Sequence, residues 1–224
     1  MKEENDDGTT GLLKASQAGY TDIVKLLLER NPNVDLCSKD GCSPLYMASQ
    51  NGYTDIVKLL LDKNPNVDLC SNDGFTPLIQ SCSRNNTGVV NALIKHKPDI
   101  NAITFDGGYA LYFSALNGNL EITQILLENN AECNICIYNY FSKKSEDYVF
   151  DVVAGSSPLH IACFMSRIDV VRCLLAHNAD INITKEDGTT PFLYACELGH
   201  EDIVRLLLDK GAETQIRRLD GRSP

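Results

Sequence analysis

Apolar residues recur along this chain in short clusters that have helical spacing. The apolar positions of the stretch 54–64, TDIVKLLLDKN, are Ile56, Val57, Leu59, Leu60 and Leu61. They form one face of an amphipathic helix. Asp55 in its first turn and Lys63 near its end match the helix macrodipole. The pattern therefore predicts a helix here that must bury its apolar face against another element.

A shorter helix is predicted just upstream, within the stretch 42–52, CSPLYMASQNG. Ser43 is a suitable N-cap, and Pro44 fits the first helical position because its missing N–H is not needed there. Gly52 suits the left-handed backbone that ends many helices. The stretch 69–74, LCSNDG, is predicted to be a turn, since Asn-Asp-Gly favours positive φ. Each unit is thus a turn, a helix, a short loop and a second helix.

These units repeat with a fixed period. GYTDIVKLLL occurs at 19–28 and again unchanged at 52–61, and NPNVDLCS occurs at 31–38 and at 64–71, each pair 33 positions apart. The same period is marked by Gly8, Gly41, Gly74, Gly107, Gly155, Gly188 and Gly221. One interval, between Gly107 and Gly155, is 15 residues too long. Because neither helix of a unit could bury its apolar face alone, adjacent units must stack.

The repeated motif resembles that of the ankyrin repeat family, D-G-x-T-P-L-H-x-A-x-x-x-G-H-x-x-I-V-x-L-L-L. The best match is DGTTPFLYACELGHEDIVRLLL at 187–208, and GSSPLHIACFMSRIDVVRCLL at 155–175 keeps the Ser-Pro-Leu-His core. The resemblance implies an all-α solenoid of helix-turn-helix units with β-hairpin fingers, in a single domain over 1–224. Its repeats are predicted at about 5–37, 38–70, 71–103, 104–136, 152–184 and 185–217, with an insertion at about 137–151 and a partial repeat at 218–224.

The third and fourth units depart from the motif. Asn85 stands where the inter-helix glycine belongs, and Ser81 replaces the packed alanine. In the fourth unit Tyr109 and Ala110 replace Thr-Pro, which removes a helix cap worth about 1 kcal/mol. We therefore predict that these two units are the least stable of the stack.

The charge and cysteine content limit the classes of partner and the cellular compartment that the chain could have. The chain carries 20 Lys and Arg against 30 Asp and Glu, so it lacks the basic patch that binds nucleic acid or anionic membranes. No apolar run approaches the roughly 20 residues of a membrane span, and the polar start MKEENDD is not a secretory signal. Nine cysteines, an odd number, favour thiols in a reducing cytoplasm over a disulfide scaffold. The expected partner is another protein, with no nucleic acid, membrane insertion or small-molecule substrate.

The sequence contains no catalytic constellation, and we expect neither an enzyme nor a cofactor or metal. Phosphate-binding glycine motifs are absent. His160 occupies the Leu-His position of the motif, where the resemblance implies a structural role. Cys133 and Cys136, in CNIC, have metal or redox spacing, but a zinc site needs a second pair.

The resemblance implies that the finger tips and the outward side of each first helix line a concave surface that binds the target. In the first two units these positions are mostly polar. From the third unit onward they are larger: Phe75, Arg84, Phe105, Leu116, Phe164, Met165 and Leu198. Exposed apolar clusters, aromatic residues and arginine mark interaction sites, so we predict that these residues bind the partner. The alternative is that several of them pack sideways into a neighbouring unit.

The long interval holds an aromatic insertion. It is predicted to form two short strands around the polar turn SKKSE, as a finger that grows from the tip on the concave side. Its aromatic residues are Tyr138, Tyr140, Phe141, Tyr148 and Phe150. We expect them to extend the partner surface, and the alternative is a flexible insertion whose aromatic residues have no role.

The function expected is a non-catalytic scaffold for protein–protein interaction. The competing interpretation is a regulatory domain that holds another part of a longer parent chain, of which this sequence is expected to be a segment. The resemblance also implies possible substrates of an asparaginyl hydroxylase, each with a leucine eight residues upstream: Asn101, Asn134 and Asn182. Turn geometry explains the same asparagines, so both interpretations stay open.

Overall fold

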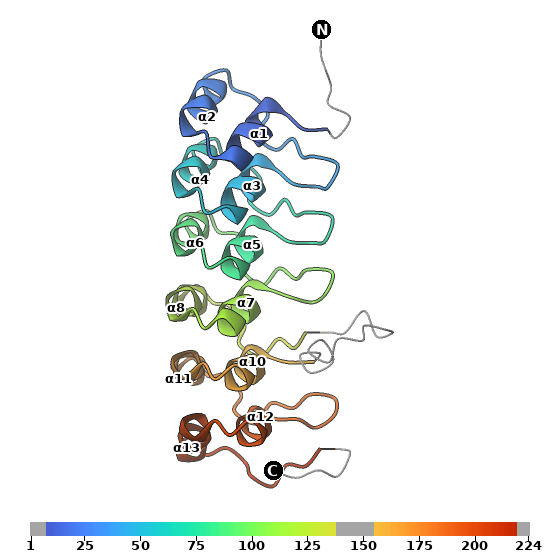
Figure 1. The fold of residues 1–224 in the computed structure, drawn as a ribbon, viewed down its shortest axis with the longest axis vertical. Helices are drawn as coiled ribbons and strands as arrows, with labels where there is room; N and C mark the ends of the chain where they lie inside the picture. Colours follow the sequence, from blue (N-terminus) through green and yellow to red (C-terminus); the bar gives the residue numbers. More distant parts are fainter. Residues whose placement is uncertain (1–7, 138–154, 219–224) are drawn as a thin grey trace. The chain divides into compact units, whose positions relative to one another are not determined.

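A computed structural model of the chain, shown in Figure 1, describes residues 8–137 and 155–218. The described residues form twelve helices and no regular β-strand. The helices are α1 (Gly11–Ala18), α2 (Thr21–Leu28), α3 (Pro44–Gln50), α4 (Thr54–Leu61), α5 (Pro77–Ser83), α6 (Thr87–Ile94), α7 (Ala110–Asn117), α8 (Leu120–Glu128), α10 (Pro158–Phe164), α11 (Ile168–Ala176), α12 (Pro191–Glu197) and α13 (Glu201–Asp209). They follow one another as pairs of short helices, which confirms the all-α repeat architecture. None of these helices is long and apolar enough to cross a membrane.

Local sequence explains where the first helix of most pairs begins. An N-cap side chain accepts a hydrogen bond from a backbone N–H three residues on at Thr10, Ser43, Thr76, Ser157 and Thr190. A proline follows the cap in four of these helices. In α7, by contrast, Tyr109 stands at the N-cap and makes no side-chain cap hydrogen bond. The predicted loss of the helix cap in the fourth repeat is therefore confirmed.

Tyr109 stabilises the fourth repeat in another way. Its side chain is 1% exposed, and its ring centroid lies 6.1 Å from that of Tyr112. Its hydroxyl donates a hydrogen bond to the backbone carbonyl of Ile135 at 2.5 Å, and burial raises the pKa of Tyr109 well above its ordinary value. The residue that removes the cap thus links the start of α7 to the loop after α8, which offsets part of the lost stability.

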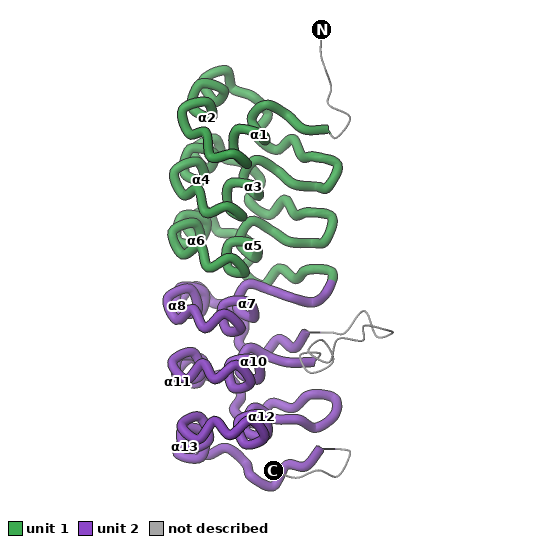
Figure 2. Tube along the Cα trace, viewed as in Figure 1, with its two compact units in different colours: residues 1–105 green, residues 106–224 purple. Residues whose placement is uncertain are grey.

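The repeats are grouped into two larger compact units, residues 1–105 and residues 106–224, which Figure 2 colours separately. In the first unit α1, α3 and α5 form one row and α2, α4 and α6 form a second layer. In the second unit α7, α10 and α12 form the row of first helices, and α8, α11 and α13 form the other layer. Each unit has its own apolar core, with Val57 and Leu60 fully buried in one and Leu111 and Leu174 in the other. That residues 1–224 form a single domain stays a prediction.

Hydrogen bonds from the residue before α6, α11 and α13 join neighbouring repeats. The Nδ2 of Asn86 donates to the backbone carbonyls of Ser49 and Gln50 at 2.8 and 3.1 Å. In the second unit, Arg167 donates through Nε to the carbonyl of Leu116 at 3.4 Å. His200 does the same through Nε2 to the carbonyl of Phe164 at 3.1 Å. These bonds satisfy carbonyls at the ends of first helices and hold those ends in place.

His160 is a structural residue, as the resemblance implies. It is fully buried, and its Nδ1 accepts a hydrogen bond from the backbone N–H of Ser157 at 3.2 Å. Its Nε2 lies 3.0 Å from the backbone carbonyl of Thr189 and must therefore carry the hydrogen. Both ring nitrogens are thus used by the neutral imidazole, which bridges two fingers within the second unit.

This arrangement predicts an acid-sensitive fold. Burial lowers the pKa of His160 from 6.5 to about 4, although the bond to Thr189 opposes the shift. In the unfolded chain His160 becomes protonated near pH 6.5, whereas in the folded chain it stays neutral down to about pH 4. The contribution of neutral His160 to the free energy of unfolding is therefore fully present above pH 6.5 and is lost as the pH falls from 6.5 toward 4. The full loss amounts to roughly 3 kcal/mol. Urea unfolding at a series of pH values measures it, and a His160→Gln variant should lose most of this slope between pH 6.5 and 4.5. An unchanged slope in that variant would show that another group is responsible.

Candidate partner-binding surface

The fingers of the first unit are closed and stacked by backbone hydrogen bonds. In the finger 38–42, Ser38 N–H donates to Cys42 O and Gly41 N–H donates to Ser38 O, both at 3.0 Å. The next finger joins it at the tip, since Asn72 N–H donates to Asp40 O at 2.9 Å. Phe105 N–H makes the equivalent bond to Asp73 O at 3.1 Å. The tips therefore form an ordered edge in which Phe105 takes the position that Asn72 takes one repeat earlier.

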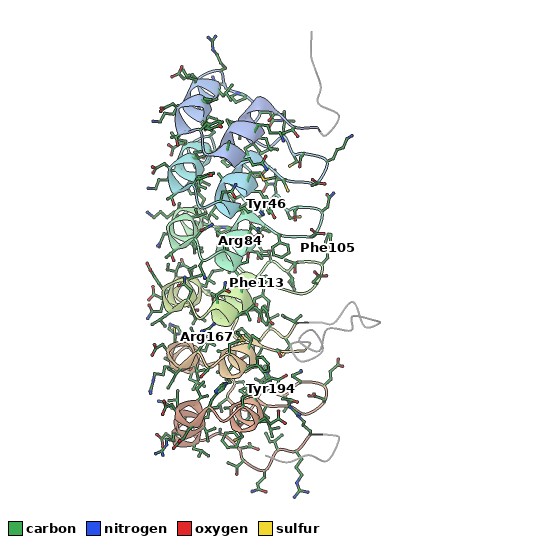
Figure 3. All side chains as sticks on the ribbon, in the orientation of Figure 1. Tyr46, Arg84, Phe105, Phe113, Arg167 and Tyr194 are labelled. Carbon is green, nitrogen blue, oxygen red and sulfur yellow. The ribbon has the colours of Figure 1, made fainter. Side chains whose placement is uncertain are left out.

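Phe105 presents its ring to solvent from this edge. Its side chain is 65% exposed, and Figure 3 places it at the end of a finger, away from the helices. The ring lies against Gly74, whose φ is +81°, and a Cβ at Gly74 would lie 3.1 Å from the ring atom Cδ1. The backbone bond and this close approach hold one side of the ring and leave the other side open. Nearby in the sequence, Phe75 is half-buried and Arg84, the C-cap of α5, is exposed.

The second unit carries the other predicted residues at the ends of its first helices. Leu116 in α7, Phe164 at the end of α10 and Met165 just after it are half-buried, and Leu198 at the C-cap of α12 is 45% exposed. The Phe164 ring packs edge-on against Tyr194, with centroids 5.3 Å apart. Phe164 thus packs sideways onto the next repeat, as the alternative expected, and still keeps part of its surface exposed.

Two aromatic residues of these helices were missed by the sequence analysis. Phe113 is half-buried on α7 and Tyr194 lies on α12, both labelled in Figure 3. Phe113 precedes Leu116 by three positions and Tyr194 precedes Leu198 by four, so both lie on the same helix faces as those leucines. That helical spacing is the signal that could have identified them.

Tyr194 is covered by charged side chains. Lys185 donates from Nζ to the Tyr194 hydroxyl at 2.9 Å, and the Arg218 guanidinium lies 6.0 Å from the ring centroid. Arg218 also bonds to Glu197 and to Thr189, each at 2.8 Å. Burial raises the pKa of Tyr194 to about 12, so its hydroxyl remains protonated at neutral pH. This cluster uses its own charges internally and supports the finger at 185–189.

The inserted segment begins and ends at the tip of a regular finger. Ile137 N–H donates to Ser156 O at 3.1 Å, and Gly155 N–H donates to Ile137 O at 2.9 Å. The same pair of bonds closes the finger 38–42, so the insertion takes the place of two tip residues. The predicted strands and the aromatic residues Tyr138, Tyr140, Phe141, Tyr148 and Phe150 lie outside the described residues and stay predictions.

The three candidate hydroxylation sites lie in the loops after the second helices. Asn134 accepts a hydrogen bond at Oδ1 from the N–H of Asp180, and Asn182 accepts one from Glu213, both at 2.9 Å. Asp68 uses its carboxylate in the same way, toward the N–H of Asp99 at 3.0 Å. The N–H of Asn101 donates to Asp99 Oδ1 at 3.1 Å. This bridging explains the Asn or Asp at positions 68, 134 and 182. Hydroxylation of Asn101, Asn134 and Asn182 stays a prediction.

The cysteines are free thiols in the part of the chain that the structure describes. All nine cysteines lie there, and none forms a disulfide. Cys133 donates from Sγ to the carbonyl of His177 at 3.3 Å, and Cys136 lies 3.9 Å from the carbonyl of Asn134. Burial raises the pKa of both thiols, so they are protonated at neutral pH. Within the described ranges no group of three or more His, Cys, Asp or Glu side chains could hold a metal ion.

Comparison with known proteins identifies the repeat. A family model described as ankyrin repeats (3 copies) matches residues 1–69, 63–139 and 136–218. The solved ankyrin repeat domain of human ASB11 is 24% identical with a TM-score of 0.80, covering 96% of this chain and 90% of that chain. The ankyrin repeat domain of Bcl-3, a member of the IkappaB protein family, is 23% identical with a TM-score of 0.81, covering 98% of this chain and 93% of that chain. A comparison with curated protein sequences finds no match.

Proposed function

Because the chain belongs to the ankyrin repeat family, we propose that it is a non-catalytic scaffold that binds a partner protein through its fingers and the ends of its first helices. Ankyrin repeats generally mediate protein–protein interaction. The observation that carries the proposal is the exposed ring of Phe105 on an ordered finger edge. Its chemistry suits a partner with an apolar pocket, since a buried aromatic anchor is typical of binding hot spots.

The ends of the first helices in the second unit support the same proposal. Leu116 and Phe164 each combine a partly exposed side chain with a backbone carbonyl that is held by the next repeat. A surface that is already fixed loses little conformational entropy when a partner binds. Met165 and Leu198 add adaptable apolar area beside them. We infer that these residues form a binding surface of their own on the second unit.

We further propose that the aromatic insertion contributes to binding. Its two ends are joined by the bonds between Ile137, Gly155 and Ser156, so the segment 138–154 starts and ends at one finger tip. Long inserted loops are more often functional than idle. We also propose a reducing, cytoplasmic location, because nine cysteines, an odd number, do not suit a disulfide scaffold.

The test compares matched surface variants. The immobilised protein recovers its partner from native cells, mass spectrometry identifies it, and the purified partner is then titrated. Phe105→Ser and Leu198→Ser should each weaken binding by about 2 kcal/mol, or roughly 30-fold in Kd. Replacing Tyr140, Phe141 and Tyr148 together with Ser should abolish capture and leave helical circular dichroism intact.

Leu36 provides the control, because it is 47% exposed and is not one of the proposed binding residues. Leu36→Ser should bind like the original protein. An unchanged Kd in every surface variant would contradict the proposal. If the surface instead holds another part of a longer parent chain, a photo-crosslinker at Phe105 should label that chain itself and no separate protein.

A further inference from the structure

The loops that follow α11 and α13 in the second unit lie side by side in the register of the repeat. Asn182 accepts a hydrogen bond at Oδ1 from the N–H of Glu213 at 2.9 Å, which joins the two loops at their start. Further along, Arg218 donates through Nε to the Thr189 hydroxyl at 2.8 Å. The N–H of Lys185 donates to the carbonyl of the same Thr189 at 2.9 Å. Arg218 is therefore held near Lys185, its equivalent 33 positions earlier.

The residues just before this pair are Thr184 and Arg217, and both are exposed. Lys185 is half-buried and the Arg218 side chain is 16% exposed, because both lie against Tyr194. In the described part of the chain, neither the Thr184 hydroxyl nor the Arg217 guanidinium takes a hydrogen-bond or ion-pair partner. Thr184 and Arg217 therefore occupy the same outward position of adjacent loops, each with its polar group available.

Exposed carboxylates follow Thr184 along the chain. The stretch 184–187 reads TKED, and both Glu186 and Asp187 are exposed. The intervening Lys185 directs its ammonium group to the Tyr194 hydroxyl, 2.9 Å away, so its charge is engaged on the other side of the loop. An accessible hydroxyl followed by free carboxylates is the charge pattern that suits a kinase with a basic substrate groove.

We propose that Thr184 is phosphorylated by a serine/threonine kinase that selects acidic residues after the acceptor, and that Arg217 holds the phosphate. The Thr184 Oγ1 forms a bond to the γ-phosphorus of ATP, the bond from that phosphorus to the β-phosphate oxygen breaks, and ADP leaves. The hydroxyl proton passes to the base of the kinase. This modification goes beyond the proposed partner binding and uses none of its residues.

The phosphate changes the electrostatics of the two loops. It adds a charge of about −1.5 to −2 beside Glu186 and Asp187, which repel it. Arg217 offsets this repulsion, because its planar guanidinium can donate two parallel hydrogen bonds to phosphate oxygens. The modified Thr184 thus links the loop after α11 to the loop after α13. Since the pair is exposed, salt should weaken it.

Phosphorylation of the full chain in vitro tests the acceptor. The folded protein is incubated with ATP, Mg²⁺ and a kinase that requires acidic residues after its acceptor, and mass spectrometry maps the phosphate. Phosphate should appear at Thr184, be absent in Thr184→Ala and return in Thr184→Ser. Glu186→Gln should lower kcat/KM of the kinase roughly 2- to 5-fold, the loss of one exposed charge pair. Circular dichroism checks that each variant keeps its helices.

Thr214 is the matched control within the same protein. It is exposed in the next loop, but Gln, Ile and Arg follow it in place of acidic residues. It should therefore stay unmodified under the same conditions. Absence of phosphate from Thr184, or equal uptake at Thr214, would overturn the assignment of the acceptor.

Phosphorus NMR on the phosphorylated chain tests the contact with Arg217. The second proton of a phosphothreonine titrates near pH 6, and a nearby guanidinium favours the dianion. The phosphate should therefore titrate at a lower pH in the original chain than in Arg217→Gln, and high salt should reduce the difference. Arg172→Gln removes the same charge from an exposed position on α11 and should leave the titration unchanged. Identical titration in the original chain and Arg217→Gln would rule out the contact.

Discussion

Replacing Ile56 with Ala is expected to lower the free energy of unfolding by about 3 kcal/mol, the typical cost of removing a buried branched side chain. Ile56 is 1% exposed in α4, which packs against α2, α3 and α6. The smaller side chain removes apolar burial and leaves a cavity that the stack cannot fully close. Because each repeat is stabilised mainly by its neighbours, this loss should spread to both adjacent repeats.

The matched control is Ile23→Ala, in the helix with the same sequence. Ile23 is 47% exposed, so this change should cost less than about 1 kcal/mol. Urea unfolding followed by far-UV circular dichroism measures both values under the same conditions. Equal losses in the two variants would contradict the burial on which the contrast depends.

Replacing Tyr109 with Ala should lower the free energy of unfolding by about 3–5 kcal/mol, the range for deleting a buried aromatic ring. Tyr109 is 1% exposed and packs beside Tyr112. Tyr109→Phe keeps the ring and removes only the donor to the Ile135 carbonyl, which should cost about 1–2 kcal/mol. The difference between the two variants separates the contribution of the ring from that of the hydroxyl.

Hydrogen exchange gives a second, local measurement for Tyr109→Phe. The N–H groups of Ile137 and Gly155 close the finger from which the insertion leaves, and Ile135 lies just before that finger. If the Tyr109 hydroxyl steadies this region, both N–H groups should exchange faster in the Phe variant. The N–H of Gly41, which closes the finger 38–42 in the other unit, should exchange at its original rate. Unchanged exchange at Ile137 and Gly155 would limit Tyr109 to packing.

Most of the helical architecture was predictable because its determinants are local. Ser43 and Pro44 start α3, and the same cap and proline pattern starts α5, α10 and α12. The departure at Tyr109 was also visible in the sequence, and the missing cap is confirmed. The contact that offsets the missing cap was not predictable, because the Tyr109 hydroxyl donates to the carbonyl of Ile135, 26 residues further along the chain.

The candidate site was predictable only in outline. The repeat register identified Phe105 and Leu198 as outward positions, and both are exposed. It did not predict that Phe164 would share its ring surface with Tyr194, because that contact depends on the conformation of the next repeat. The ion pair between Arg218 and Glu197 was also not predictable from the sequence, because the two residues are 21 positions apart.

The sequence by itself determined the helices, their caps, the 33-residue period and the place of the insertion, because spacing and capping act within a few residues. Only the tertiary structure decided which apolar residues are buried. GYTDIVKLLL occurs twice without a change, yet Ile23 is 47% exposed and Ile56 is 1% exposed. The physical reason is that burial depends on the element packed alongside, and α4 has α2 beside it while the same face of α2 remains open.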